Sequence, residues 1–481
     1  LIAMNLQTLE LKAFYADAVI MATGGPGMVF GKSTNSQTCT GSAVSACYQQ
    51  GAKYANGEFI QVHPTSIPGE DKLRLMSESA RGEGGRVWVP KNQGDARSPK
   101  DIPETERRYF LEEKYPAYGN LVPRDIATRE IFQICLEGSG VGGENQVYLD
   151  LTHIDSETLT RKLGAILEIY EMFVGDDPRH VPMRIFPGVH YSMGGLWVDF
   201  DQKTNIPGLF AAGECDYSIH GANRLGANSL VSCVYGGFVA APSAIDYAKN
   251  VERKTTETNG IHEAELRRQQ EINDQIIKNE GSENQYKIHD EMGKWMTDNV
   301  TVVRYNDRLK ATDEKLVELQ DRFKNISIND SNLWATQAVP HARQLWNMLE
   351  LARVITLGAL NRDESRGAHY KPDFPDRNDD EFLKTTIAEW SAESPIISYE
   401  AVDIGLIEPR KRDYSSGKAK AAVAQQAEKA GLPVPDGAAQ VPVPYTEQKP
   451  ENTDRQNTVN EKDAQIKDGV SFKEIHEKDE S

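Results

Sequence analysis

Six side chains able to do acid–base or ion-pairing chemistry lie at the ends of predicted strands or at the starts of loops and helices, beside or near Gly or Pro: His63, Glu78, Arg81, Arg124, His190 and Arg224. Arg binds carboxylates through two parallel hydrogen bonds. Taken singly, each His also fits a hydrogen-bonded core position, and each Arg a solvated face. The shared loop context favours function over packing, and two His with two Arg suit a small dianion.

The elements that must position these residues are predicted strands over 17–22, 58–65, 147–151, 196–199 and 207–214, and predicted helices over 41–51, 126–136, 161–173 and 342–360. The second strand ends at His63-Pro64. The first strand runs into a Gly-rich turn, where Gly24 and Gly25 let the backbone approach a large cofactor closely. A simple turn after a strand would have the same pattern.

A second Gly-containing loop, residues 220–230, carries Arg224, a His and two Asn among small residues. An apolar run follows it, which predicts a buried helix with Asn228 or Ser229 as its N-cap. Backbone N–H groups and a fixed cation in such a loop suit an anionic ligand. Alone, the loop equally fits an ordinary surface position.

The composition bounds the classes of function. The 481 residues are enough for two or more domains. The net charge of -18, from 54 basic and 72 acidic residues, argues against nucleic acid as a partner. The five Cys include no C-x-x-C pair, so we expect no metal site, no iron–sulfur cluster and no disulfide framework. We also expect no membrane span and no signal peptide.

The two ends of the chain differ from its middle. Residues 1–12 predict a strand already under way, so we expect an internal start with an N-terminal segment missing. Residues 251–395 predict mostly helix. Residues 416–481 are rich in charge, punctuated by Pro and almost without aromatics, which predicts a disordered tail.

Several longer motifs occur in a fixed order along the chain: ATGGPG at 22–27, QVHPT at 61–65, SESARGEGG at 77–85, PRDIATRE at 123–130, HYSMGG at 190–195, AAGE at 211–214, HGANRLGANSL at 220–230 and RDESRGAH at 362–369. In these motifs the chain resembles the flavoprotein subunit of succinate dehydrogenase and fumarate reductase of the kind found in bacilli. The resemblance covers roughly residues 1–415. Long motifs in family order are more specific than any single Gly pattern.

The resemblance implies an α/β fold with a Rossmann-like FAD-binding domain, incomplete at its N-terminus. A capping α+β domain would interrupt it, and a helical domain and the disordered tail would follow. The implied ranges are 1–60 and 191–250 for FAD binding, 61–190 for the cap, 251–395 for the helical domain, 396–415 for a C-terminal segment and 416–481 for the tail. The family's opening G-x-G-x-x-G unit and its FAD-linking His do not occur here, so we expect weak FAD retention by this chain alone.

The resemblance also implies roles for individual residues. Those that match the dicarboxylate site are His63, Ser77, His190, Arg224 and the backbone of Ala227. Arg124 matches the proton donor and acceptor, and Glu78 and Arg81 match the relay that feeds it. The implied FAD contacts are Gly24, Gly25, Glu214, Ser229 and Leu230.

The implied reaction is oxidation of succinate to fumarate, or its reverse, by hydride transfer to FAD. Electrons would pass to an iron–sulfur subunit and on to quinone, through a complex with a membrane-anchor cytochrome b subunit. The protein would then lie peripherally on the cytoplasmic face of the cell membrane. Two alternatives stay open: a non-catalytic fragment lacking bound FAD, and a related flavin oxidase such as L-aspartate oxidase.

Overall fold

The computed structural model describes residues 1–67, 69, 73–217, 219–226, 228–252, 260–328, 330, 332–405 and 409. The predicted tail and Ala227 lie outside them. The strands are β1 Ile2–Met4, β2 Leu11–Ala13, β3 Val19–Met21, β4 Tyr54–Ala55, β5 Ile60–Ile67, β6 Arg74–Leu75, β7 Arg86–Pro90, β8 Arg107–Arg108, β9 Val147–Asp150, β10 Met183–Ser192, β11 Gly195–Leu196, β12 Leu209–Ala211, β13 Lys384–Glu389 and β14 Ile396–Ala401. The α-helices are α1 Ser42–Tyr48, α2 Ser79–Gly82, α3 Phe110–Lys114, α4 Arg124–Leu136, α5 Ser156–Val174, α6 Asn228–Asn250, α7 Ile261–Lys278, α8 Gln285–Val300, α9 Asn306–Phe323, α10 Ala338–Asn361 and α11 Asp379–Phe382.

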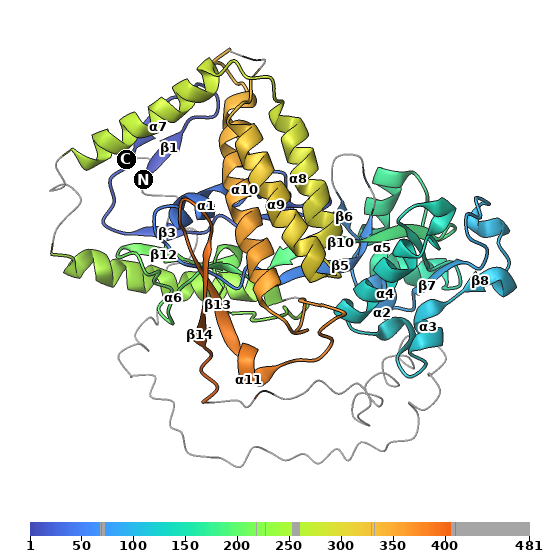
Figure 1. Cartoon of the computed structure of the whole chain (residues 1–481). Coiled ribbons are helices and arrows are strands. Elements are labelled where there is room, and N and C mark those ends of the chain that lie inside the picture. Colours follow the sequence, from blue (N-terminus) through green and yellow to red (C-terminus); the bar gives the residue numbers. More distant parts are fainter. Residues whose placement is uncertain are drawn as a thin grey trace, which may run out of the picture. The chain divides into compact units, whose positions relative to one another are not determined.

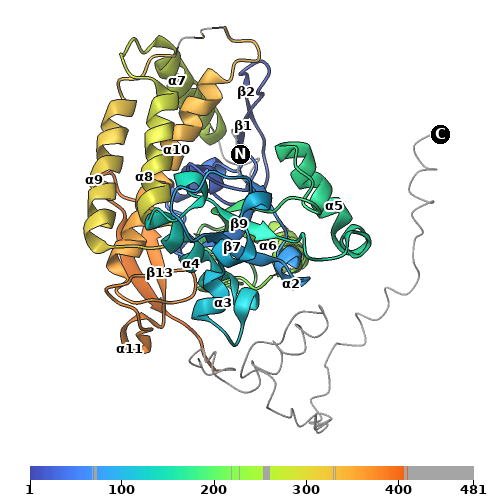
Figure 2. The same ribbon diagram turned by 90° about the vertical axis from the view of Figure 1, so that its right-hand side faces the viewer.

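A six-stranded antiparallel sheet, in the order β6-β5-β10-β9-β7-β8, carries both predicted site histidines. Helix α4 packs against β5 and β10, and α3 packs against β7. Figure 2 shows α3 next to β7. Strand β5 is buried along its whole length. His63 lies opposite the stretch around Gly188 of β10, and the register shifts between Val189 and Tyr191. Such a bulge turns one side chain away from the regular alternation, and here that residue is His190.

Two parallel strands, β3 and β12, end at the same edge, because parallel strands run in one direction. The turn with Gly24 and Gly25 follows β3. The short 3₁₀ helix Gly213–Cys215, which contains Glu214, follows β12. Open α/β sheets bind ligands at the carboxyl ends of their strands, so this edge is where a cofactor is expected.

The region 251–395 is mostly helical, as expected. Helices α8, α9 and α10 stand side by side in Figure 1 and share one core. Helix α10 buries the predicted face of Leu345, Leu349, Ala352 and Thr356 completely. Residues 384–389 nevertheless form β13, which pairs with both β14 and β4. Its two Thr and one Ile favour a strand over a helix.

Residues 1–13 form a hairpin, β1–β2, instead of the single strand that the sequence suggested over residues 1–12. The Asn5 side chain accepts hydrogen bonds from the backbone N–H of Gln7 at 2.9 Å and of Thr8 at 3.2 Å. This Asx-type turn reverses the chain. The strand predicted over 196–199 is likewise reduced to β11.

Helix α6 forms as predicted, but its large apolar side chains are exposed, with Leu230 at 75% and Phe238 at 76%. The buried residues are small and lie four apart: Ser232, Gly236, Ala240 and Ala244. This small face lets α6 approach β12 and β3 closely. The prediction of a buried helix was therefore wrong about which side chains pack. Asn228 and Ser229 lie inside the first turn, not at the N-cap position before it.

The length and composition of α6 would also allow a membrane span, and within the described ranges it is the one helix that passes this test. The sequence analysis predicted no segment long and apolar enough to span a membrane, and α6 corrects this prediction as far as length and composition are concerned. Pro242 lies inside α6. The face of α6 that carries small residues packs on β12 and β3. One such helix is weak evidence for membrane insertion.

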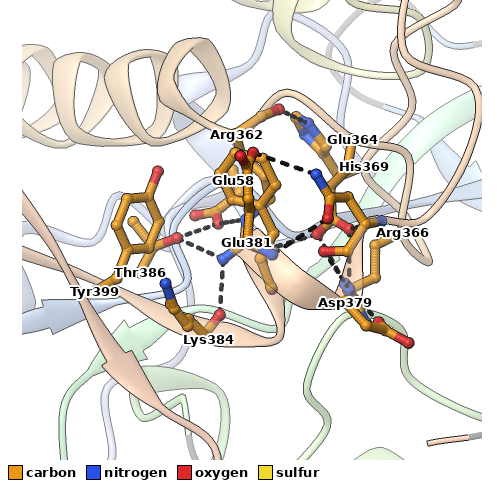
Figure 3. A network of polar contacts seen from close by, with 12 residues as sticks. Glu58, Arg362, Glu364, Arg366, His369, Asp379, Glu381, Lys384, Thr386 and Tyr399 are labelled. Carbon is orange, nitrogen blue, oxygen red and sulfur yellow. Dashed lines mark hydrogen bonds and ion pairs between the residues drawn. The ribbon is translucent and has the colours of Figure 1, made fainter.

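A buried ionic network joins segments that are far apart in the sequence (Figure 3). Arg362, at the end of α10, donates from Nε to Glu58 at 2.7 Å and from Nη1 to Glu364 at 2.8 Å. It also donates to the Thr386 hydroxyl of β13 at 2.8 Å. The side chains of Arg362, Glu58 and Glu364 are all fully buried. The network therefore fixes the end of α10 against the segment that leads into β5.

Candidate active site

His63 and His190 face each other from β5 and β10. Their ring centroids are 5.2 Å apart in an edge-to-face arrangement. His190 Nδ1 lies 2.8 Å from the Thr34 hydroxyl. Burial, and after it the charges of nearby Arg side chains, lowers the pKa of His190 to about 4 and holds the pKa of His63 well below its usual value. Both rings are therefore neutral at pH 7.

Glu78 connects two of the predicted arginines. Its Oε1 accepts a hydrogen bond from Arg81 Nη2 at 2.8 Å, and its Oε2 accepts one from Arg124 Nε. Arg81 is only 2% exposed, and it also donates to the carbonyl of Asn120 at 2.8 Å. Burial lowers the pKa of Arg81. The structure thus brings Arg124, Glu78 and Arg81 into one continuous chain of polar contacts.

Arg124 is the first residue of α4, directly after Pro123. The helix starts two residues earlier than the sequence predicted, and Pro123 suits the position just before it because Pro lacks an N–H to satisfy. Arg124 Nη1 is buried and makes no hydrogen bond within the described part of the chain. This donor is therefore available to a ligand.

Arg224 lies on the loop before α6 and is 4% exposed. Its guanidinium is 4.6 Å from the centroid of the Tyr191 ring, and its buried Nε makes no hydrogen bond to any described residue. Gln61 of β5 holds the loop, because its Nε2 donates to the Arg224 carbonyl at 2.7 Å. At Gly226, an added Cβ would lie 3.2 Å from Arg124 Nη2. The loop and the start of α4 are therefore in near contact.

The electrostatics of this region favour a dianion. Burial, and then the charge of Arg124, lowers the pKa of Arg224. Among the residues that the structure describes, Arg124 and Arg224 each keep one buried donor without a partner, and Glu78 is the carboxylate that pairs with Arg124. A buried donor without a partner is costly unless a ligand supplies an acceptor. Two guanidinium groups beside two neutral imidazoles can receive the two ends of a small dicarboxylate.

The cofactor side of the site lies at the ends of β3 and β12. A Cβ added to Gly25 would lie 2.5 Å from Glu214 Oε1, so only Gly lets this turn lie against the carboxyl. Glu214 Oε1 accepts a hydrogen bond from the Ser192 backbone N–H at 3.0 Å. Burial raises the pKa of Glu214 to about 7. A close-packed glycine turn, an acceptor for a ligand hydroxyl and the adjacent start of α6 fit a dinucleotide cofactor.

Some predicted site residues are not drawn into these contacts. The Ser77 hydroxyl donates to the Ser79 hydroxyl at 3.1 Å. The Ser229 carbonyl accepts from the Ser232 hydroxyl at 2.7 Å, and Leu230 points to solvent. Ala227 lies outside the described residues. The roles of these four residues stay predictions.

Three residues of the site were missed from the sequence: Gln61, Thr34 and Tyr191. Gln61 precedes His63 by two positions, and alternate residues of a strand share a face. That spacing could have found it. Thr34 contacts His190 from a distant loop, and no pattern in the sequence points to this contact.

Comparisons with known proteins show the family to which the chain belongs. A family model described as FAD binding domain matches residues 1–230, and one described as Fumarate reductase flavoprotein C-term matches residues 289–414. The succinate dehydrogenase flavoprotein subunit of Bacillus subtilis (strain 168) is 61% identical over 422 residues, which cover 87% of this chain and 70% of that protein. This chain belongs to the succinate dehydrogenase and fumarate reductase flavoprotein family. Another member, the fumarate reductase flavoprotein subunit of Escherichia coli (strain K12), is 37% identical and covers 88% of this chain and 69% of its own length.

Solved structures of the family share the fold. A quinol-fumarate reductase determined with menaquinol molecules gives a TM-score of 0.77 at 32% identity, covering 85% of this chain and 70% of the other. Sdh1 of Mycobacterium smegmatis in complex with UQ1 gives 0.72 at 26% identity, covering 92% and 69%. The predicted fold class is confirmed, with an FAD-binding domain and a C-terminal helical domain. FAD is the cofactor, and the chain is an oxidoreductase of this flavoprotein family.

Proposed function

We propose that this chain interconverts succinate and fumarate at the site between Arg124 and Arg224. The observation that carries the proposal is the pair of buried arginine donors, Arg124 Nη1 and Arg224 Nε, which have no partner among the described residues and lie beside two neutral histidines. A dicarboxylate supplies the missing acceptors at both ends. The name of the B. subtilis relative favours this reading over an L-aspartate oxidase.

Substrate binding is the task of the arginine–histidine group. Arg224 would hold one carboxylate, with its position fixed by the Tyr191 ring and by Gln61. His63 and His190 would act as neutral hydrogen-bonding partners of a carboxylate. Because the site is buried, these contacts act in a low dielectric, where oriented donors stabilise developing charge strongly. Ser77 and the backbone of Ala227 are proposed to complete this carboxylate site.

Proton transfer is the task of Arg124. A guanidinium in water has a pKa above about 12, so it cannot simply accept a proton. Arg124 can accept a proton from a succinate carbon only once it has passed one of its own through Nε to Glu78, so its positive charge is restored at the end of the step. Arg81, whose pKa is lowered by burial, lies on the far side of Glu78 and extends the relay. Fumarate reduction uses the same contacts in reverse.

Bound FAD would supply the acceptor for the hydride that leaves the neighbouring carbon of succinate. Gly24, Gly25 and Glu214 would hold it at the carboxyl edge of β3 and β12. Ser229 and Leu230, in the first turn of α6, would lie along it, where the positive end of the helix dipole favours negative charge.

The partners follow from the relatives' names. The B. subtilis and E. coli proteins are subunits of a succinate dehydrogenase and a fumarate reductase. We infer an iron–sulfur subunit as electron partner, a membrane-anchor cytochrome b subunit beyond it, and quinone as the distant electron carrier. The chain would then be peripheral to the cell membrane, on its cytoplasmic face.

The decisive experiment is Arg124→Ala in the FAD-loaded enzyme complex, assayed with dye acceptors for succinate oxidation and with a reduced dye for fumarate reduction. We expect both rates to fall by about 100-fold or more, the range for loss of a positioned acid–base group. Dicarboxylate binding, measured from the flavin absorbance change, should weaken but persist, because Arg224 and the two histidines still contact the ligand. The matched control is Arg161→Ala, an exposed arginine of α5. Retained turnover in both directions would remove Arg124 from the mechanism.

A further inference from the structure

Arg129 of α4 reaches a segment more than two hundred residues away in the sequence. Its Nη2 donates to the Gly367 carbonyl at 3.0 Å, and its guanidinium lies 4.3 Å from the centroid of the Tyr370 ring. Asp125, one turn earlier on α4, is 3.9 Å from the same guanidinium. A planar guanidinium that stacks and donates at once has a well-defined orientation. Arg129 therefore joins α4 to the segment around Gly367.

That segment lies directly on the loop that carries Arg224. The Ala368 backbone N–H donates to the Ala222 carbonyl at 2.9 Å. Gly367 has φ +56°, and a side chain there would overlap the Ala222 carbonyl. Ala222 precedes Arg224 by two residues. The contacts thus run from Arg129 through Gly367 and Ala368 to the substrate loop.

The segment is itself held rigidly. Arg366 donates to Glu364 at 2.7 Å and to Asp379 at 2.7 Å. His369 is fully buried, and its Nδ1 is 2.5 Å from Arg304 Nη1. Figure 3 shows Arg366 and His369 at the edge of the Arg362 network. Arg129 therefore attaches α4 to a fixed anchor.

We propose that Arg129 is a positioning residue that fixes the start of α4, and with it Arg124, against the loop that holds Arg224. The inference rests on the proposed function, because it assigns importance to the spacing of these two arginines. Arg124 and Arg129 are five residues apart, about 7.5 Å along a helix. Arg124 already lies close to the loop at Gly226, where an added Cβ would be 3.2 Å from its Nη2. The contact made by Arg129 is a second attachment, so it limits rotation of α4 about the first.

The test is Arg129→Ala in the FAD-loaded enzyme complex. The matched control is Arg161→Ala, at an exposed arginine of α5. We expect kcat to fall about tenfold or more, because misplacement of a reacting group by an ångström is enough for such losses. The KM for succinate should rise as well. FAD content and Tm should match the control, because Arg129 is partly exposed. Succinate should slow hydrogen exchange at residues 220–226 in the control and fail to do so in Arg129→Ala.

Arg129→Lys separates positioning from charge. Lys keeps the positive charge and one donor but lacks the flat face that stacks on Tyr370, so we expect partial recovery of kcat. Equal kinetics in Arg129→Ala and Arg161→Ala would overturn the proposal. So would a loss of FAD or of Tm in Arg129→Ala large enough to account for the lost rate. If Arg124→Ala is inactive while Arg129→Ala is normal, only the positioning role fails; if Arg124→Ala is active, the proposed function fails first.

Discussion

Burial shifts the pKa values of individual side chains in this site in opposite directions, and in each case it favours the neutral form. It lowers the pKa of His63 and His190 and raises that of Glu214 to about 7. Desolvation penalises whichever form is charged, so the histidines stay neutral and the carboxyl is half protonated near pH 7. The fixed positive charge of the proposed substrate site then resides on its arginines, which are the side chains best suited to two carboxylates.

A histidine outside the site allows the same physics to be tested through stability. His341 of α10 contacts His289 Nδ1 at 3.2 Å, and burial, followed by the His289 charge, lowers the pKa of His341 to about 4. In the unfolded chain its pKa is about 6.5. Between these values the unfolded chain binds more protons, so folding stability falls as the pH drops from about 6.5 to about 4.

His341→Gln should weaken this acid sensitivity by on the order of 2 kcal/mol over that interval. The measurement is urea unfolding at pH 7, 5.5 and 4.5. His180→Gln, which replaces an exposed histidine with a side-chain exposure of 65%, is the control. Parallel pH profiles for the wild type and His341→Gln would contradict the assignment.

Single residues were predictable where a local pattern marks them. Arg124 follows Pro123 at the start of α4, and Arg224 lies near Gly226 in a loop. His63 precedes Pro64, but it lies inside β5, which continues to Ile67, so the predicted end of this strand at His63-Pro64 was wrong. The structure nevertheless brings the three side chains together. Thr34 was not predictable, because its contact with His190 depends on a loop that is separate in the sequence. Leu230 was assigned to the cofactor by motif, yet its side chain is exposed.

At the scale of elements, short-range periodicity predicted most strands and helices of the site but not their irregularities. The bulge in β10 aims His190, and no alternation pattern reveals a register shift. Helix α6 was predicted, but the packed face was misjudged. Large apolar residues suggested the core, whereas Gly236 and its small neighbours make the close contact, because an added Cβ at Gly236 would lie 3.1 Å from Ala212 Cβ.

The contact between residues 366–370 and the substrate loop gives an element-scale prediction. Gly367→Ala should cost about 1–3 kcal/mol, because Ala disfavours φ +56° and its Cβ would overlap the Ala222 carbonyl. We expect the KM for succinate to rise together with a lower Tm. Gly164→Ala on α5 is the control, since the nearest atom to its added Cβ is 4.0 Å away. An unchanged KM would show that the loop tolerates displacement at Ala222.

At the scale of the whole molecule, the network around Arg362 unites parts that the sequence presents separately. It joins Glu58 before β5, the end of α10 and β13. The motif at 362–369 was evident in the sequence, but its partners were not. A salt bridge between residues 304 positions apart cannot be inferred from one sequence, because nothing local to either residue specifies the other.

Removing Arg362 should therefore destabilise the fold strongly. Arg362→Met leaves the Glu58 and Glu364 carboxylates buried without their shared cation, which typically costs about 3–5 kcal/mol. Lys324→Met, at an exposed ion pair with Asp321, should change stability by less than about 1 kcal/mol. Chemical denaturation of both variants measures the difference. Similar losses in the two would mean that the buried network contributes little.

The near contact of Arg124 with Gly226 has a consequence for selectivity. Arg124 and Arg224 belong to different parts of the chain, one at the start of α4 and the other on the loop before α6. Under the proposed function, a ligand with two carboxylates draws these parts together, whereas a monocarboxylate engages only one of them. Selectivity for dicarboxylates over monocarboxylates then requires both arginines to bind the ligand at once. It therefore depends on how rigidly α4 and the loop before α6 are held, as much as on the shape of any single pocket.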